Sequence, residues 1–535
     1  MPDYEDRLRL RLGERWWDDL IVVKWRPQCV IRVLMVADGA TFDAGGGYRV
    51  SRVLEALRHD LPSYVRMDIT TARHGSVSAD ASADVNGLRF DQHDLSRYDQ
   101  IWLFAVSPGN SLAAGEATAL WEFMQGGGGV FATGDHEALG EGLCGRVPRV
   151  RSMRRWYFPA PGPNGEPVAP ARDVGGGRGE NDSTTTAGGS DFDGRPQTIR
   201  PVLYSSQGPF VFTARDYPHP VLCGAGGRIT VLPDHMHEGV VEVPADLEMP
   251  ISVDGVAVEE YPRAGADRLP PEVIAYSTVN NNPAGHPFGV IGVYDGHQVD
   301  EITGGVGRVV VDATWHHFWN MNVEQFASAH DAVRQATLAG TPVDPAWVAP
   351  AAAWEQIRDY FQNIAFWLAR RSTQACVRRR GLWILTQHVD VLMALASHQF
   401  DRVGHLADLG AKARDALQRV ARQCETLRLT WELPLLVEFL PWWRIPIPDP
   451  PWERQIPLLE QRLLDDVVLG AQVEAMARLT AGAGSADEVA ELLGRDDVDT
   501  RLAEAAAEAI RELGGRLAAD AKRLARMAGP GRRAD

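Results

Sequence analysis

The chain has 535 residues, of which 45% are hydrophobic and 23% charged, and this composition excludes a disordered or collagen-like protein. The formal net charge of -17 at pH 7 argues against nucleic acid or an anionic membrane as partner, because both are held by positive charge. The N-terminus mixes acidic and basic residues and has no apolar segment of a secretory signal, so we expect a cytoplasmic protein. The most apolar later run, 381–396, is interrupted by His388 and Asp390 and is shorter than the ~20 residues that a bilayer needs.

Strand-like and helix-like segments alternate through the first three fifths of the chain. Near-continuous apolar runs are typical of buried parallel strands, and the stretches between them have apolar residues at helical spacing. We therefore predict an α/β domain with a mostly parallel sheet and helices on both faces. The expected strands lie at 31–39, 64–72, 98–106, 129–133, 208–214, 227–243, 271–277, 288–296 and 307–318, and the expected helices at 48–61 and 112–127.

The chain changes character twice along its length. Residues 159–200 are rich in Gly, Pro, Ser, Thr and Asp without an apolar period, which indicates a long irregular insertion. After about residue 345 the apolar residues recur at helical spacing, which predicts an all-helical bundle. One such stripe consists of Trp354, Ile357, Phe361, Ile364 and Leu368. The predicted organisation is an N-terminal extension at 1–30, the α/β domain at 31–325, a linker at 326–350 and the helical domain at 351–535.

Ligand-type side chains follow three of the expected strands, at 133–137, 233–239 and 312–317. Ligands bind at the carboxyl ends of parallel strands, so we expect the three segments to converge there. The histidines of the middle segment alternate and point the same way, which favours half a site for zinc, iron or manganese. Alternatively, they lie in a polar loop and bond to the backbone. The metal hypothesis names His136, Asp234, His235, His237, Glu238 and His317 as ligands.

Two further groups have open interpretations. His316 or His317 is either a general base or metal ligand, oriented by Asp312, or a core histidine beside Trp315, Phe318 and Trp319. Five arginines between positions 146 and 155 clamp an anionic substrate group, lie on a solvated helix face or pair with the protein's surplus acids. In the first case Arg154 and Arg155 contact the substrate.

Two motifs argue against other chemistry. Cys144 follows the 133–137 segment by several residues, which favours a buried thiol over a nucleophile. The glycine-rich stretch 43–49 lacks both the Lys and Ser/Thr of a P-loop and G-x-G-x-x-G spacing. No nucleotide cofactor is therefore expected.

The succession "YDQIWLFAVSPGNSL", "ALWEFMQGGGGVFATGDHEALG", "HPVLCG" and "GRVVVDATWHHF" resembles the class I glutamine amidotransferase-like superfamily, and most of all its ThuA-like, trehalose-utilisation branch. The resemblance covers about residues 30 to 325 and implies a flavodoxin-like sheet. It places the nucleophile turn at Asp135, the loop of oxyanion donors at Ser107 to Asn110 and the late histidine at His316. An aspartate stands where the amidotransferases have cysteine, which puts ammonia transfer from glutamine in doubt. ThuA-like proteins also lack that cysteine and are associated with carbohydrates.

The turn at Asp135 can take part in catalysis without a cysteine. Backbone N–H groups and a positive helix end favour an ionised Asp135, which suits a base or a metal ligand. We expect a metal-activated water to attack an ester, amide or glycosidic carbon of a small molecule. Asp135, Glu137 and His316 are then the catalytic residues, and Ser107, Asn110, Arg154 and Arg155 bind substrate. The alternative is a catalytically idle amidotransferase-like scaffold whose helical domain binds a protein partner or a second copy.

Overall fold

The computed structural model describes residues 28–155, 196–420 and 458–527, apart from positions 46, 60, 63, 110, 136–138, 208–213, 225–226, 234–238, 249, 266, 279–286, 300–304 and 398–400. Nearly all of the insertion predicted at 159–200 lies outside these residues, as does the N-terminal extension except its last positions. The described chain forms two compact units. Unit 1 comprises Gln28–Val202 and Pro218–Gln374, and unit 2 comprises Leu203–Tyr217 and Ala375–Asp535.

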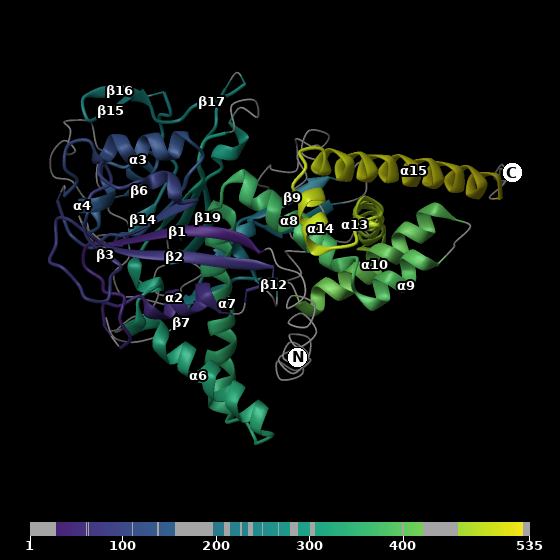
Figure 1. The fold of residues 1–535 in the computed structure, drawn as a ribbon, viewed down its shortest axis with the longest axis horizontal. Helices are drawn as coiled ribbons and strands as arrows, with labels where there is room; N and C mark the ends of the chain where they lie inside the picture. The colour runs from purple at the N-terminus through teal and green to yellow at the C-terminus, as the bar shows by residue number, and fades with distance from the viewer. Residues whose placement is uncertain are drawn as a thin grey trace, which may run out of the picture. The chain divides into compact units, whose positions relative to one another are not determined.

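Unit 1 is built around a nine-stranded sheet of order β3-β2-β1-β4-β5-β21-β20-β19-β8 (Figure 1). The pairings from β3 to β21 are parallel, and those from β21 to β8 are antiparallel. The predicted α/β class with a mostly parallel sheet is confirmed. The strands are β1 Cys29–Ala37, β2 Val65–His74, β3 Val85–Leu88, β4 Gln100–Phe104, β5 Gly129–Ala132, β8 Arg200–Pro201, β19 Glu272–Thr278, β20 Pro287–Tyr294 and β21 Val309–Asp312.

Helices cover both faces of this sheet. Figure 1 shows α3 (Glu116–Gln125) on one face and α2 (Ser51–Arg58) with α7 (Pro345–Leu368) on the other. The predicted stripe from Trp354 to Leu368 is buried, and α7 uses it to pack against the sheet strands β1, β5 and β21. This apolar contact fixes α7 to the α/β unit.

The linker predicted at 326–350 is wrong. Most of these residues belong to α6 (Asn320–Ala339) and to the start of α7, which pack against each other. The side of α6 that includes Phe326 and Val333 is buried, although half of the residues of this helix are polar. Helix α7 begins where the Asp344 carboxylate accepts a hydrogen bond from the Ala346 N–H at 2.9 Å.

The single strand predicted at 227–243 is also wrong, because the segment is broken into short strands outside the central sheet. They are β12 Gly227–Arg228, β13 Val231–Pro233 and β14 Val240–Val241, which pair with β11 Cys223–Gly224, β7 Pro196–Thr198 and β6 Arg154–Arg155. Pro233 lacks the N–H that a longer ladder needs. Of the strand predicted at 208–214, only Ala214 is described.

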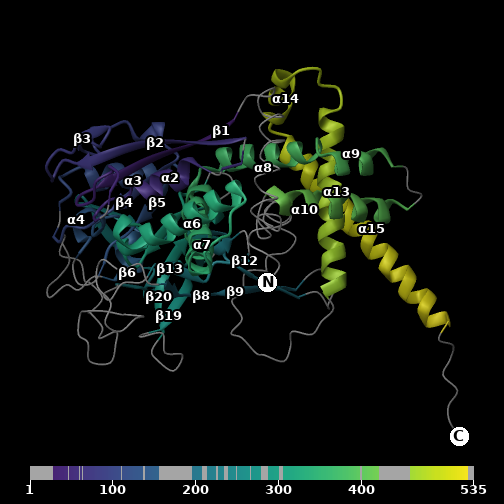
Figure 2. The same ribbon diagram turned by 90° about the horizontal axis from the view of Figure 1, so that it is seen from below.

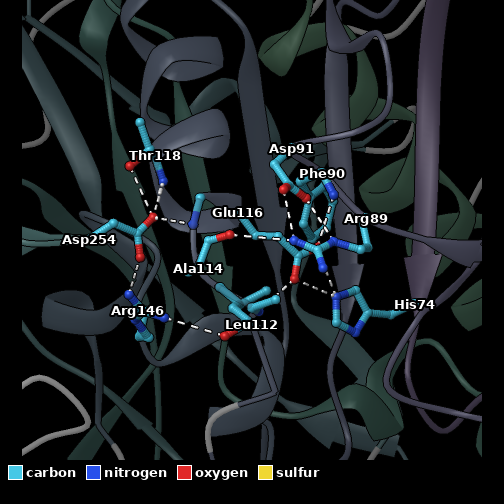
Figure 3. A network of polar contacts seen from close by, with 12 residues as sticks. His74, Arg89, Phe90, Asp91, Leu112, Ala114, Glu116, Thr118, Arg146 and Asp254 are labelled. Carbon is cyan, nitrogen blue, oxygen red and sulfur yellow. Dashed lines mark hydrogen bonds and ion pairs between the residues drawn. The ribbon is translucent and has the colours of Figure 1, made fainter.

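The N-terminus of α3 is capped by side chains from other segments (Figure 3). Asp254 lies at the tip of the hairpin β15 (Pro250–Val253) to β16 (Val256–Glu259), and its carboxylate accepts the Gly115 and Thr118 N–H groups at 3.1 and 3.0 Å. Arg146 pairs with the same carboxylate. Glu116 accepts hydrogen bonds from two backbone N–H groups and lies 3.1 Å from His74 Nε2. Asp254 therefore satisfies N–H groups that the start of α3 leaves open, and Glu116 satisfies backbone N–H groups that precede the helix.

Unit 2 is mainly helical, as predicted for the C-terminal region. Its apolar core joins α10 with α13 and α13 with α15 (Figure 2). The helices are α8 Arg371–Leu385, which begins in unit 1, α9 Val389–Ala396, α10 Arg402–Val420, α13 Leu458–Thr480, α14 Ala486–Leu493 and α15 Val498–Met527. Within the described part of the chain, every helix is too short or too polar to span a membrane.

Candidate functional site

Two of the three predicted clusters meet at the carboxyl edge of the parallel strands. The Asp135 turn follows β5 and the His316 segment follows β21, its neighbour in the sheet. The Trp315 N–H donates to the Gly134 carbonyl at 3.0 Å and joins the two turns. The third cluster, with Asp234, His235, His237 and Glu238, lies outside the described residues. So do Asn110, His136 and Glu137.

Asp135 and His316 form a buried pair. His316 Nε2 lies 3.7 Å from Asp135 Oδ2, and the residues are 3% and 1% exposed. The other ring nitrogen, Nδ1, lies 2.8 Å from Asn322 Oδ1, in the first turn of α6. An amide oxygen only accepts, so with the Asn322 amide in this orientation Nδ1 carries the hydrogen. In neutral His316, the Nε2 lone pair would then face the Asp135 carboxylate. One further proton, shared between Nε2 and the carboxylate, makes the two groups complementary.

Arg154 contacts the backbone of the Asp135 turn. Its guanidinium donates to the Asp135 carbonyl and, at 3.4 Å, to the Val240 carbonyl, and the residue is buried. A Cβ at Gly239 would lie 1.9 Å from Arg154 Nη2, so the position needs glycine. Burial excludes a solvated face for Arg154, and its role in substrate binding stays a prediction. Arg155 pairs through its backbone with Val240, and its side chain lies outside the described structure.

The loop after β4 was expected to supply oxyanion donors. Three of its backbone N–H groups instead donate to carboxylates of the chain itself. The Val106 and Ser107 N–H groups donate to Asp38 at 2.6 and 3.1 Å, and the Gly109 N–H donates to Glu141 at 3.2 Å. Burial raises the pKa of both the Asp38 and the Glu141 carboxyl, although these hydrogen bonds oppose it. The expected role of the Ser107 N–H as a donor to substrate is therefore not available in this arrangement.

Asp38 is the site residue that sequence reasoning passed over. Asp38 directly follows β1. The strand order of the sheet reverses between β1 and β4, and open α/β sheets bind ligands at such a point. The Asp-Gly pair after an apolar run was the available signal. At Gly39 a Cβ would lie 2.6 Å from Val106 Cβ, so glycine allows the two strand ends to approach.

His317 does not have the geometry of a metal ligand. Its Nδ1 lies 2.7 Å from Asp312 Oδ1 and its Nε2 lies 2.7 Å from Gln197 Oε1, so both ring nitrogens have protein partners. The Tyr360 hydroxyl donates to Asp312 Oδ2 at 2.6 Å, and all four residues are buried. These two partners argue against His317 as a metal ligand, and Asp312 orients His317, one of the two histidines for which this contact was expected. The described residues hold no group of three or more His, Cys, Asp or Glu able to share a metal ion.

Cys144 is a buried thiol, as the sequence favoured. Its Sγ lies 3.6 Å from the Thr133 carbonyl, which accepts its hydrogen. Burial, together with the charge of Asp38, raises the pKa of the Cys144 thiol well above its usual range. A thiol held neutral is a poor nucleophile.

Comparison with protein-family models, curated proteins and solved structures finds no match to the chain. The fold itself defines an α/β protein with a mostly parallel nine-stranded sheet and a C-terminal helical region. Its polar site lies at the carboxyl edge, at β1, β4, β5 and β21.

Proposed function

We propose that unit 1 is a hydrolase with a flavodoxin-like, glutamine amidotransferase-like fold of the ThuA-like kind, in which Asp135 stands at the position of the absent cysteine. The observation that carries the proposal is the pairing of Asp135 with His316, at 3.7 Å, on the turn after a central parallel strand. A buried carboxylate and imidazole that share one proton can exchange it with a reacting group. The expected substrate is a small carbohydrate or amide.

The reaction would use water as the nucleophile. The water oxygen forms a bond to the substrate's carbonyl or glycosidic carbon, and the proton it loses passes to the Asp135–His316 pair. The bond to the leaving atom then breaks, and the pair returns the proton to that atom. Asn322 keeps the His316 ring in the required orientation through Nδ1. General acid and base catalysis of this kind contributes roughly 10²- to 10⁴-fold.

A divalent zinc, iron or manganese ion belongs to the proposal only through His136 and the segment 234–238. If these residues bind a metal, it would polarise the substrate or acidify water. Of the predicted ligands, the structure describes His317, which does not fit such a site, because Asp312 and Gln197 contact both of its ring nitrogens. No step above depends on a metal. Metal content of protein purified without chelator, compared between wild type and a His235→Ala/His237→Ala variant, tests this part separately.

The hydrolase proposal is tested with Asp135→Asn and His316→Gln on a panel of neutral esters, amides and glycosides. Both variants should lose at least about a hundredfold in kcat on any substrate that the wild type cleaves. Asp267→Asn, on an exposed strand end, is the matched control and should keep the rate. A wild-type activity that survives both site variants would overturn the assignment.

The second candidate is a catalytically idle scaffold, favoured by a separate observation. The loop N–H groups that would stabilise an oxyanion already bind Asp38 and Glu141. In this proposal the helical unit mediates assembly with a protein partner or a second copy, in the cytoplasm and without nucleic acid or membrane. Sedimentation of the full chain, together with the absence of turnover on the whole panel, would support it over the hydrolase.

A further inference from the structure

We infer that Trp315 and Trp319 form a ligand-binding wall beside the Asp135–His316 pair, that Tyr48 covers this wall, and that its ligand is an uncharged ring with hydrogen-bond acceptors. The inference rests on the proposed function, whose substrate it specifies. It is argued from the geometry of three aromatic side chains and from two indole N–H groups.

The two indoles stack on each other, and the His316 ring lies tilted against both. Trp315 and Trp319 are nearly parallel, with ring centroids 5.0 Å apart and an interplanar angle of 14°. The His316 ring lies 5.9 Å from Trp315 and 5.6 Å from Trp319. The wall is therefore continuous with the imidazole that faces Asp135. A ring bound on it would lie next to the proposed proton-transfer pair.

Both indoles leave a polar group unused. Trp315 Nε1 and Trp319 Nε1 are buried and have no hydrogen-bond partner among the described residues. A buried donor without a partner costs roughly 1 to 3 kcal/mol, so such groups in native proteins call for an explanation. Two of them on adjacent stacked rings beside a candidate acid and base are explained if a ligand supplies the acceptors.

Tyr48 closes the wall from the solvent side. Its ring packs edge-on against Trp319 with centroids 4.2 Å apart, while the residue itself is 46% exposed. Gly45 and Gly47, which precede Tyr48 in the loop, have φ values of 131° and 91°, which other residues adopt at a cost. The Asn320 side chain holds the Gly45 carbonyl at 2.6 Å. Tyr48 is thus a side-chain cover on a loop anchored to the start of α6.

The charges near the wall favour a neutral ligand. Asp43 and Arg49, in the loop that carries Tyr48, pair with each other at 2.9 Å, and Asp135 faces His316. Neither pair offers an uncompensated charge to a ligand. The aromatic faces favour an apolar ring face, and the indole N–H groups favour oxygen or nitrogen acceptors on its edge. A planar aromatic amide and a saturated sugar ring share these properties.

The test follows the indole N–H signals by NMR in the full chain labelled with ¹⁵N-tryptophan. Trp315→Phe and Trp319→Phe assign the two signals, and Trp347, which is 45% exposed on α7, is the internal control. Benzamide and methyl glucopyranoside are added separately as probes, with benzoate as the charged match of benzamide. We expect one neutral probe to shift both wall signals saturably, without moving Trp347, and benzoate to shift neither. The probe that binds shows whether the ligand ring is an aromatic amide or a sugar.

The cover is tested by hydrogen exchange of the same signals. Tyr48→Ala should accelerate exchange of the Trp319 indole N–H at least tenfold, whereas Tyr48→Phe, which keeps the ring, should exchange as the wild type does. Circular dichroism shows whether each variant is folded. Unchanged exchange in folded Tyr48→Ala overturns the cover, and absence of any saturable wall shift with both neutral probes overturns the binding wall. A benzoate shift equal to that of benzamide overturns the neutral class.

These outcomes are separable from those of the proposed function, because binding is measured without turnover. Asp135→Asn should abolish hydrolysis and leave the probe shifts in place. Probe binding without turnover on the panel supports the wall and counts against the hydrolase. Turnover that needs Asp135, together with silent indole signals, supports the hydrolase and counts against the wall.

Discussion

The Asp254 carboxylate accepts hydrogen bonds from Thr118 at both its backbone N–H, at 3.0 Å, and its hydroxyl, at 2.9 Å. The aspartate lies at a hairpin tip, in a left-handed conformation with φ 47°, and caps a helix from a distant part of the chain (Figure 3). Helix α3 has no cap of its own at Gly115, where a side-chain oxygen is absent. The hairpin therefore supplies from outside what the local sequence lacks.

Asp254→Ala should lower the free energy of unfolding by about 1 to 2 kcal/mol, the usual cost of losing a helix cap. The buried Arg146 also loses its ion-pair partner in this variant, which adds to the cost. Equilibrium unfolding in urea measures the difference. Asp267→Ala, at an exposed strand end, is the control and should change stability little. Equal midpoints for the two variants would show that the cap contributes nothing.

The same cap predicts acid sensitivity. Burial raises the pKa of the Asp254 carboxyl, but its bonds from Thr118 and Arg146 outweigh this and hold the pKa below its usual value. For Glu116, bonds from His74, Ala113 and Phe90 likewise outweigh burial. A lowered folded-state pKa stabilises the protein above the unfolded values of 3.8 and 4.5 and loses that contribution as the pH falls.

Unfolding free energy should therefore fall between about pH 5 and pH 3, and less steeply in Asp254→Asn, which removes one of the two titrating groups. Urea unfolding at several pH values measures the slope. An Asp254→Asn slope identical to that of the wild type would mean that this carboxyl does not take part.

Local patterns sufficed for much of the fold. The buried strands β1, β4 and β21 were predicted because their residues are apolar on both faces, and the Trp354 to Leu368 stripe because its period is helical. Ser485 and Glu488 have the spacing of a capping box, and the Ser485 hydroxyl accepts the Glu488 N–H at 3.2 Å. The assignment of α6 to a linker and of α7 to the helical domain failed. The spacing of apolar residues identifies a buried helix face, but it does not show which unit the face packs against.

The site was predicted to the level of strand ends, and no further. Convergence of Asp135 and His316 follows from parallel topology, which the alternation of elements implied. That His317 also contacts Gln197 depends on a pairing across 120 residues, which local spacing cannot encode. The use of loop N–H groups by Asp38 and Glu141 is equally nonlocal. Sequence reasoning thus located the edge and misassigned individual side chains on it.

Cys144 should be inert in the folded protein. Its raised pKa leaves little thiolate at about pH 8, and each unit of increase reduces the thiolate fraction tenfold. Iodoacetamide should label it at least about a hundredfold more slowly in the native protein than in urea, as mass spectrometry of the Cys144 peptide can measure. Cys144→Ser should retain activity on any substrate that the wild type cleaves. Rapid native labelling, or loss of activity in a folded Cys144→Ser protein, would instead indicate a nucleophile.

The crossing of α10 and α13 depends on two glycines. A Cβ at Gly410 would lie 1.7 Å from the Asp466 carbonyl oxygen, and a Cβ at Gly470 would lie 2.0 Å from the Leu406 carbonyl oxygen. These neighbours are backbone atoms, so relief requires the helices to separate and the apolar core between them to open. Each site gains a helix-favouring residue on substitution by alanine, worth about 1 kcal/mol, and the steric cost of overpacking should exceed that gain.

Gly410→Ala and Gly470→Ala should each destabilise the helical unit by about 2 to 3 kcal/mol, the scale of an overpacked core. Gly515→Ala is the matched control, because its Cβ meets nothing within 4 Å on helix α15 and should stabilise the helix by up to about 1 kcal/mol. Thermal unfolding followed by circular dichroism compares the three variants with the wild type. If Gly410→Ala and Gly515→Ala shift the transition in the same direction, helix propensity rather than close helix packing governs these positions.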